Sequence, residues 1–256
     1  MLSFGNISIK DMYFGSTKIG EAYLGSTKVY GSGISPSLPP YTIRLKYKQG
    51  TTPTFSKGTG VLVDSTNNIW DLTYENTAWI KLLQNHTDLL EVIDANTEGV
   101  VNMNDMLYNC NSLTYVPLFD TSNVTYMKEM LYNCSALTSV PSFDTSSVTD
   151  ISFMLYNCTS LTSVPLFNTS KVTNMASMLR NCESLTSIPL FDTSKVTTMN
   201  NAFNRCLSVQ SGALALYQQA STQTTPPTSH NTTFRNCGVY TQTGAAELAQ
   251  IPDDWK

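Results

Sequence analysis

Charged residues are scarce in this chain and make up 13% of its 256 residues, against roughly 25% in an average globular protein. Lys and Arg number 15 and Asp and Glu 19, so the net charge is −4. There is no basic excess to hold a nucleic-acid backbone, and nucleic acid is therefore not expected as a partner. Ser, Thr and Asn replace the missing charges, which favours a β-rich structural or adhesive protein over a cytosolic enzyme.

The sequence also lacks segments that direct a protein into a membrane. No apolar run approaches the roughly 20 residues that are needed to span a bilayer. The N-terminus, residues 1–6, has no basic region followed by an apolar one. We therefore expect neither a signal peptide nor membrane insertion.

Motifs for catalysis or metal binding are missing as well. The two histidines, His86 and His230, stand far from any His-Glu-x-x-His pattern, and no Gly-x-Ser-x-Gly, phosphate-binding or dinucleotide-binding motif is present. His86 is expected to be a packing residue and His230 to be solvated in a Pro-rich loop. We predict that the protein is not an enzyme and has no cofactor or metal site.

What the chain does contain is a repeat of 24 residues. Five of its six cysteines mark the period, at Cys110, Cys134, Cys158, Cys182 and Cys206. Met, Leu, Pro, Phe and Val recur in fixed phase with them, and a constant interval of this size is typical of stacked repeats. Seven coils are readable, because His86 marks a degenerate first coil and Cys237 an atypical last one.

Within one coil, residues 144–167, the pattern predicts a short helix followed by a short strand. Residues 144–146, Asp-Thr-Ser, could cap a helix, and the apolar positions in 148–155 follow one another at helical spacing. Residues 161–167 are rich in strand formers, with Leu166 expected to point inward as in a leucine-rich-repeat strand. The recurring Asp120, Asp144 and Asp192 are then helix caps.

The regular cysteines allow three interpretations: a series of disulfides, a metal site, or a buried column of thiols. Parallel side chains in stacked coils would keep their Cβ atoms about 5 Å apart, which is long for a disulfide. No Cys-x-x-Cys or Cys-x-x-His pair supports a zinc site. We favour buried thiols that fill space, and we interpret the methionine column in the same way.

The string Met-x-x-Met-Leu-Tyr-Asn-Cys-x-Ser-Leu-Thr-Ser-Val-Pro-Leu-Phe-Asp-Thr-Ser-x-Val-Thr resembles the BspA-like leucine-rich repeats over roughly residues 76–240. Such repeats occur in surface proteins of gut bacteria and in proteins of gut bacteriophages. The resemblance implies a surface protein that adheres to a ligand. The predicted fold is an α+β leucine-rich-repeat solenoid of 24-residue coils, each with a short helix and a short strand, preceded by a small β module.

The ends of the chain predict further parts. Residues 1–30 form an N-terminal β attachment module, 31–40 a linker, 41–75 a small β capping unit, 76–240 the solenoid and 241–256 a C-terminal cap. Strands are expected at 41–48, 61–63 and 69–74, and helices at 212–219 and 244–250. Two strings of the first module resemble N-terminal modules of phage virion proteins, so Tyr13, Phe14, Tyr23 and Leu24 are candidates for docking to a particle.

Two faces compete as the binding surface. One is the solvent side of the stacked strands, with Tyr115 followed by Ser139, Ser163 and Ser187. The other is a row at the helix end, formed by Tyr108, Tyr132 and Tyr156, which could contact sugar rings or a protein. The alternative for that row is that each tyrosine merely covers its neighbour.

The first hypothesis for function is a bacteriophage virion protein: a head fibre, tail fibre or decoration protein. It would be made in the host cytoplasm, dock to capsid or tail proteins through its N-terminus, and bind a host-surface or mucosal glycan or protein through many weak contacts. The alternative is a bacterial cell-surface adhesin of BspA type, and a cytosolic scaffold or inhibitor is a third. A homo-oligomer formed through residues 1–40 is expected.

Overall fold

The computed structural model describes residues 3–4, 7–9, 22–24, 27–28, 38–39 and 41–256. The chain divides into two compact units, Met1–Pro39 and Pro40–Lys256. In the first unit four short strands, β1 (Ser3–Phe4), β2 (Ile7–Ile9), β3 (Ala22–Leu24) and β4 (Thr27–Lys28), form an antiparallel sheet in that order. Tyr23 and Leu24 belong to β3, whereas Tyr13 and Phe14 lie outside the described residues.

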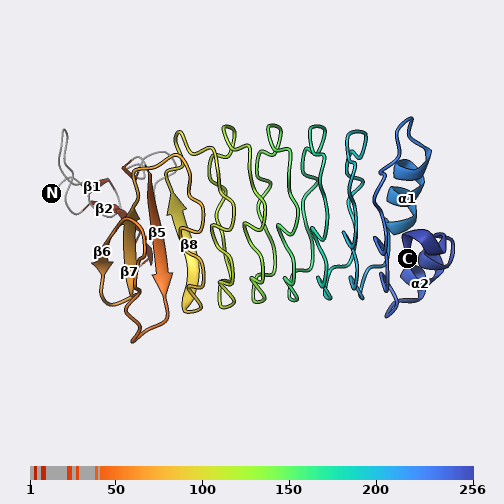
Figure 1. The fold of residues 1–256 in the computed structure, drawn as a ribbon. Coiled ribbons are helices and arrows are strands. Elements are labelled where there is room, and N and C mark those ends of the chain that lie inside the picture. The colour runs from red at the N-terminus through yellow and green to blue at the C-terminus, as the bar shows by residue number, and fades with distance from the viewer. Residues whose placement is uncertain (1–2, 5–6, 10–21, 25–26, 29–37, 40) are drawn as a thin grey trace. The chain divides into compact units, whose positions relative to one another are not determined.

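The second unit begins with a four-stranded antiparallel sheet in the order β6-β7-β5-β8 (Figure 1). Its strands are β5 (Thr42–Tyr47), β6 (Thr59–Asp64), β7 (Ile69–Thr73) and β8 (Leu89–Ala95). The strands predicted at 41–48, 61–63 and 69–74 are confirmed. Residues 89–95 were expected to be part of a coil instead. Two register shifts in the pairing of β5 with β8 break the strict alternation of inward and outward side chains along the strand. The buried Leu89 and Val92 can therefore be three positions apart, which is the spacing of the equivalent apolar residues in the later coils.

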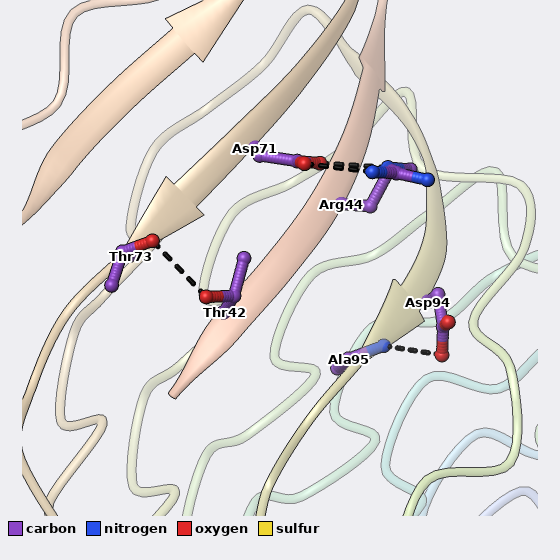
Figure 2. A network of polar contacts seen from close by, with 6 residues as sticks. All are labelled: Thr42, Arg44, Asp71, Thr73, Asp94 and Ala95. Atoms are coloured by element: carbon purple, nitrogen blue, oxygen red, sulfur yellow. Dashed lines mark hydrogen bonds and ion pairs between the residues drawn. The ribbon is translucent and has the colours of Figure 1, made fainter. Parts of the chain in front are cut away.

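Polar contacts join neighbouring strands of this sheet (Figure 2). Arg44 on β5 donates from Nε and Nη2 to the two carboxylate oxygens of Asp71 on β7, each at 2.7 Å. The hydroxyls of Thr42 and Thr73 lie 3.0 Å apart on the same pair of strands. Paired side chains across an antiparallel ladder fix its register, and this sheet then covers the first coil.

The coils stack one after another from β8 toward α1 and α2 (Figure 1). A column of parallel bridges runs through the stack and joins residues 78, 102, 126, 150, 174, 198 and 229, and two further parallel bridges join Glu91 to Tyr115 and Ser187 to Ser211. Inside, the cysteine, methionine and leucine columns belong to one continuous apolar core. The burial predicted for the cysteines and methionines is confirmed, since all six thiols are buried.

The predicted fold class was wrong. Among the described residues from 98 to 212 there is neither an α-helix nor a strand. Over residues 41–256, the described part of the second unit, the regular secondary structure consists of the antiparallel sheet, two short helices at the C-terminal end, and one 3-10 turn. The coils are therefore not the helix-plus-strand units of an α+β leucine-rich-repeat solenoid.

The predicted helix at 148–155 fails because the backbone adopts a left-handed conformation at two residues of the coil, four positions apart. Phe153 and Asn157 have φ angles of 56° and 58°. Alternate residues donate their N–H groups to carbonyls of the next coil at 2.8–3.1 Å, namely Ile151, Phe153, Leu155 and Asn157. Met154, Tyr156 and Cys158 instead donate their N–H groups to carbonyls three residues earlier in the chain. The result is a chain of turns, because each α-helical residue would need a bond four residues back.

The predicted strand at 161–167 fails because its backbone N–H groups do not form a continuous ladder with the neighbouring coil. Thr162 donates its N–H to Thr138 of the preceding coil at 3.0 Å, but Pro165 has no N–H. Phe167 then donates back to the Pro165 carbonyl at 3.0 Å in a tight turn. Leu166, expected to be in the core, is 62% exposed.

Two helices and a 3-10 turn close the stack at its C-terminal end (Figure 1). They are α1 (Ala213–Thr222), α2 (Gln242–Ala249) and η1 (Asp253–Trp255), and the predicted helices at 212–219 and 244–250 are confirmed. Phe234 of the last coil donates its N–H to the Trp255 carbonyl at 2.9 Å. His230 was expected to be solvated, but its ring stacks on Trp255 with centroids 4.2 Å apart. In the described part of the chain, no helix has the length and apolar character required to cross a bilayer.

Candidate functional site

The predicted tyrosine row is a face-to-face stack. Ring centroids of Tyr108 and Tyr132 are 4.5 Å apart, those of Tyr132 and Tyr156 are 4.6 Å apart, and the planes are within 8° of parallel. The guanidinium of Arg180 continues the stack 5.8 Å from the Tyr156 ring centroid. Burial, followed by the neighbouring tyrosines, raises the pKa of Tyr132 to about 12. Because both faces of the Tyr132 ring are covered, it cannot stack on a sugar, and this geometry favours the packing interpretation.

Asparagines form a second internal column beside the tyrosines. Asn133 donates its side-chain amide to Asn109 at 2.9 Å, and Asn157 donates in the same way to Asn133. Asn109 and Asn157 both adopt positive φ, a region that asparagine tolerates better than most residues. These side chains are occupied in joining the coils.

The aspartate column caps turns instead of helices, so that expectation was wrong too. Asp144 Oδ1 accepts the backbone N–H of Ser146 at 2.9 Å, and Asp120 and Asp192 repeat the contact with Ser122 and Ser194. Hydrogen bonds from these serines lower the pKa of each carboxyl below its usual value. Such carboxylates are held as turn caps and are not paired for acid–base chemistry.

The other predicted surface carries an exposed apolar row. We define the leucine face by the segments 114–118, 138–142, 162–166 and 186–190. Four large apolar side chains in these segments are exposed by more than half, namely Tyr115 52%, Leu118 67%, Leu166 62% and Leu190 54%, whereas Val116, Val140 and Ile188 are buried. Ser139, Ser163 and Ser187 are exposed beside them, and Ser142 occupies the leucine position of its coil.

Threonine hydroxyls hold the coil spacing along the leucine face. Thr114 donates to the Leu90 carbonyl at 3.0 Å, Thr162 to Thr138 at 3.2 Å and Thr186 to Thr162 at 3.1 Å. Each bond joins neighbouring coils, which places equivalent side chains about 4.8 Å apart, the spacing of paired extended chains. The face is therefore ordered before any ligand arrives.

Sequence reasoning recognised Tyr115 and the serines as solvent-facing but missed the leucines. It placed Leu166 in the core because the pattern of a strand was assumed. Ser142 in the same column was the available signal, because a core position rarely accepts a serine.

A cavity of about 300 Å³ lies near the first coil. It is lined by Tyr47, residues 51–54, Ser56 and residues 84–88. The loop after β5 supplies one wall, and the turn before β8 supplies the other. Sequence reasoning did not predict it. The one signal was His86, which replaces the cysteine found in the later coils.

His86 is held at this cavity by aromatic neighbours. Tyr47 Oη lies 2.6 Å from His86 Nδ1, and the Phe55 ring stacks on the imidazole with centroids 5.7 Å apart. Burial lowers the pKa of His86 and raises the pKa of Tyr47 far above its usual range. His86 is thus half-buried as predicted, and it also forms part of the cavity wall.

The thiols are engaged with backbone carbonyls. Cys134 Sγ lies 3.3 Å from the Leu107 carbonyl, and Cys110, Cys158, Cys182 and Cys206 repeat this contact at 3.1–3.3 Å, each with the residue 27 positions earlier. Burial raises the pKa of Cys158 to about 12. Within the described residues, no three His, Cys, Asp or Glu side chains are grouped to hold a metal ion.

Stacked 24-residue coils with one ordered, exposed face define a repeat protein. Residues 77–186 and 161–243 match the model of the family described as "Mycoplasma protein of unknown function, DUF285", and the chain belongs to this family. The match is compatible with the BspA-like resemblance and suggests a surface repeat protein. It does not reach the N-terminal unit and gives no sign of a virion module. No curated protein and no solved structure matches the chain.

Proposed function

We propose that the protein is a surface-displayed adhesive repeat protein that binds a ligand on another surface through the leucine face. The observation that carries the proposal is the row of exposed Tyr115, Leu118, Leu166 and Leu190 along the stack. Exposed apolar side chains bordered by polar ones are typical of interaction sites, and here they occur in three of the four segments of the leucine face.

The chemistry of the leucine face narrows its ligand. None of the described residues in its four segments is charged. Its contacts would be apolar side chains and hydroxyls, so we expect binding that changes little with salt. A protein or glycan surface with repeated epitopes fits best, because one contact per coil is weak and many contacts act together.

A cell-surface adhesin of BspA type is the form that the family supports. A virion fibre or decoration protein is the second candidate, and it rests on the Gly-Ser-Thr strings of the first unit and on the division of the chain into two compact units. In either case the first unit is proposed to attach the chain to its support and to bring copies together. Fractionation distinguishes the two: a fixed copy number in purified particles supports the virion role, and recovery in envelope fractions supports the adhesin.

The adhesive role is tested with the triple variant Leu118→Ser, Leu166→Ser and Leu190→Ser. Ser142 already occupies this column, so the variant should fold with an unchanged melting temperature. We expect binding to immobilised mucin or host cells to fall roughly tenfold or more, since several apolar contacts are lost together. Surface binding with labelled protein measures the change.

The matched control is Tyr126→Asn. Tyr126 is 48% exposed in another column, where Asn174 occurs naturally. It should bind like the unchanged protein. Equal binding by the triple variant and the unchanged protein would refute the leucine face as the adhesive surface.

A further inference from the structure

We propose that the cavity between residues 51–56 and 84–88 binds a neutral, polyhydroxylated ligand, namely a terminal sugar residue of a glycan. The proposal goes beyond adhesion through the leucine face and depends on different residues. It rests on the lining chemistry and on the fixed imidazole of His86.

The lining is rich in groups that bond hydroxyls. Thr51, Thr52, Thr54, Ser56 and Thr87 contribute hydroxyls, and two amides come from Gln84 and Asn85. Hydroxyls and amides both donate and accept, as a sugar hydroxyl also does. Thr51 Oγ1 already donates to the Lys48 carbonyl and Asn85 Oδ1 already accepts from Asn109, so Thr51 offers an acceptor and Asn85 a donor. A cavity of about 300 Å³ is at the small end of ligand sites, which suits a single sugar residue better than a long chain.

The charge of the lining argues against anions. No Lys or Arg is among the described residues that line the cavity. Asp88 is its single carboxylate, and its Oδ1 lies 3.3 Å from Lys48 Nζ. Phosphates and acidic sugars would find no cationic partner in the wall, whereas a carboxylate readily accepts the hydroxyls of a neutral sugar.

His86 supplies a donor of fixed direction. Tyr47 is 2% exposed, and His86 Nδ1 is the one hydrogen-bond partner of its hydroxyl among the described residues, so the phenol donates to Nδ1 and the ring hydrogen of the neutral imidazole resides on Nε2. No described residue accepts a hydrogen bond from Nε2. Stacking on Phe55 fixes the ring plane, so this N–H is oriented before a ligand binds.

The position of His86 in the repeat explains why this side chain is available. In the later coils the column residue is a cysteine whose Sγ meets a carbonyl 27 residues earlier, in the coil before. The first coil has no coil before it, and the loop after β5 lies there instead. The column therefore opens to a cavity at this one coil.

The test measures binding of neutral monosaccharides to the full chain by saturation-transfer NMR and calorimetry, with inorganic phosphate and sialic acid as anionic probes. We expect at least one neutral hexose or N-acetylhexosamine to bind and the anions not to bind. His86→Cys introduces the residue of the other coils and removes the imidazole, so affinity should fall roughly tenfold. Asp88→Asn should weaken binding severalfold and, because this side chain is half exposed, should leave the fold unchanged.

Leu166→Ser serves as the control, and it should retain sugar binding while it weakens adhesion. This separates failure of the sugar site from failure of the leucine face. Absence of neutral-sugar binding to the unchanged protein, a preference for the anions, or unaltered affinity in both Asp88→Asn and a folded His86→Cys would overturn the proposal.

Discussion

At the scale of the residue, the place in the 24-residue period decides what a side chain does. The cysteine column is buried in every coil that contains it, and its thiols face backbone carbonyls. Burial raises the pKa of Cys158 to about 12 and that of Cys134 well above its usual value. The thiols are therefore stable only in their neutral form, and this predicts how the protein responds to alkali.

We expect the free energy of unfolding to fall as the pH rises above about 9. Below the pKa of an exposed thiol, 9.0, folded and unfolded states hold the same thiol protons and this contribution is constant. Above it the unfolded chain releases protons that the folded chain keeps until about pH 12, so stability is lost at about 1.4 kcal/mol per pH unit for each thiol. Urea unfolding under reducing conditions at a series of pH values measures the slope.

The matched variant is Cys158→Ala. Its free energy of unfolding should fall less steeply with pH, because one titrating thiol is missing. The same slope in both proteins would contradict the assignment of this loss to buried thiols.

The burial or exposure of a column could be predicted from the sequence when its residues are alike in polarity from coil to coil. Cys and Met in fixed phase predicted burial, and Tyr115 with its serines predicted exposure. Leu166 and His230 could not be placed, because neither residue type shows in the sequence whether another side chain covers it: Leu166 is exposed and His230 is covered. The stacking of His230 on Trp255 joins residues that are distant in the repeat pattern.

At the scale of the element, the helix prediction failed for a general reason. Apolar residues spaced by three, three and one positions fit the stripe of a helix, but a succession of turns buries the same positions. Phe153 and Asn157 decide between the two through their positive φ angles. An asparagine at one of the two positions was the only sequence signal, since phenylalanine gives no hint of a left-handed backbone.

Asn157→Ala should destabilise the protein by about 1–2 kcal/mol, because alanine is strained at positive φ and also loses the amide contact with Asn133. Asn157→Gly should cost less, since glycine adopts this conformation freely. The difference between the two variants isolates the backbone share, and urea unfolding measures both.

Ser163→Ala, on an exposed position of the same coil, should stay within about 0.5 kcal/mol of the unchanged protein. If alanine and glycine at position 157 were equally destabilising, the backbone explanation would be refuted.

At the scale of the molecule, each coil bonds mainly to its neighbours. Backbone N–H groups reach about one period forward or backward in the sequence, as from Leu155 to Met178 and from Thr162 to Thr138. Stability in such a stack is close to a sum over coils and the contacts between them. The sequence period predicted this repetition, but it could not predict β8 as part of the capping sheet or the cavity beside it.

Removal of residues 145–168, one full period, should leave a cooperative protein with a lower melting temperature. The new junction of Asp144 with Thr169 restores the Asp-Thr-Ser sequence and the contacts between coils. Removal of residues 157–168, half a period, should abolish cooperative melting because apolar columns would then meet polar ones. Circular dichroism during heating distinguishes the two, and equal behaviour of both deletions would contradict a stack that depends on its register.

The cavity beside His86 is built once, where the stack begins, whereas the leucine face gains one five-residue segment with every coil. Lengthening or shortening the stack would therefore alter valency on one surface and leave stoichiometry at the other fixed at one site per chain. Variants of different length would share the same sugar preference while they differ in avidity.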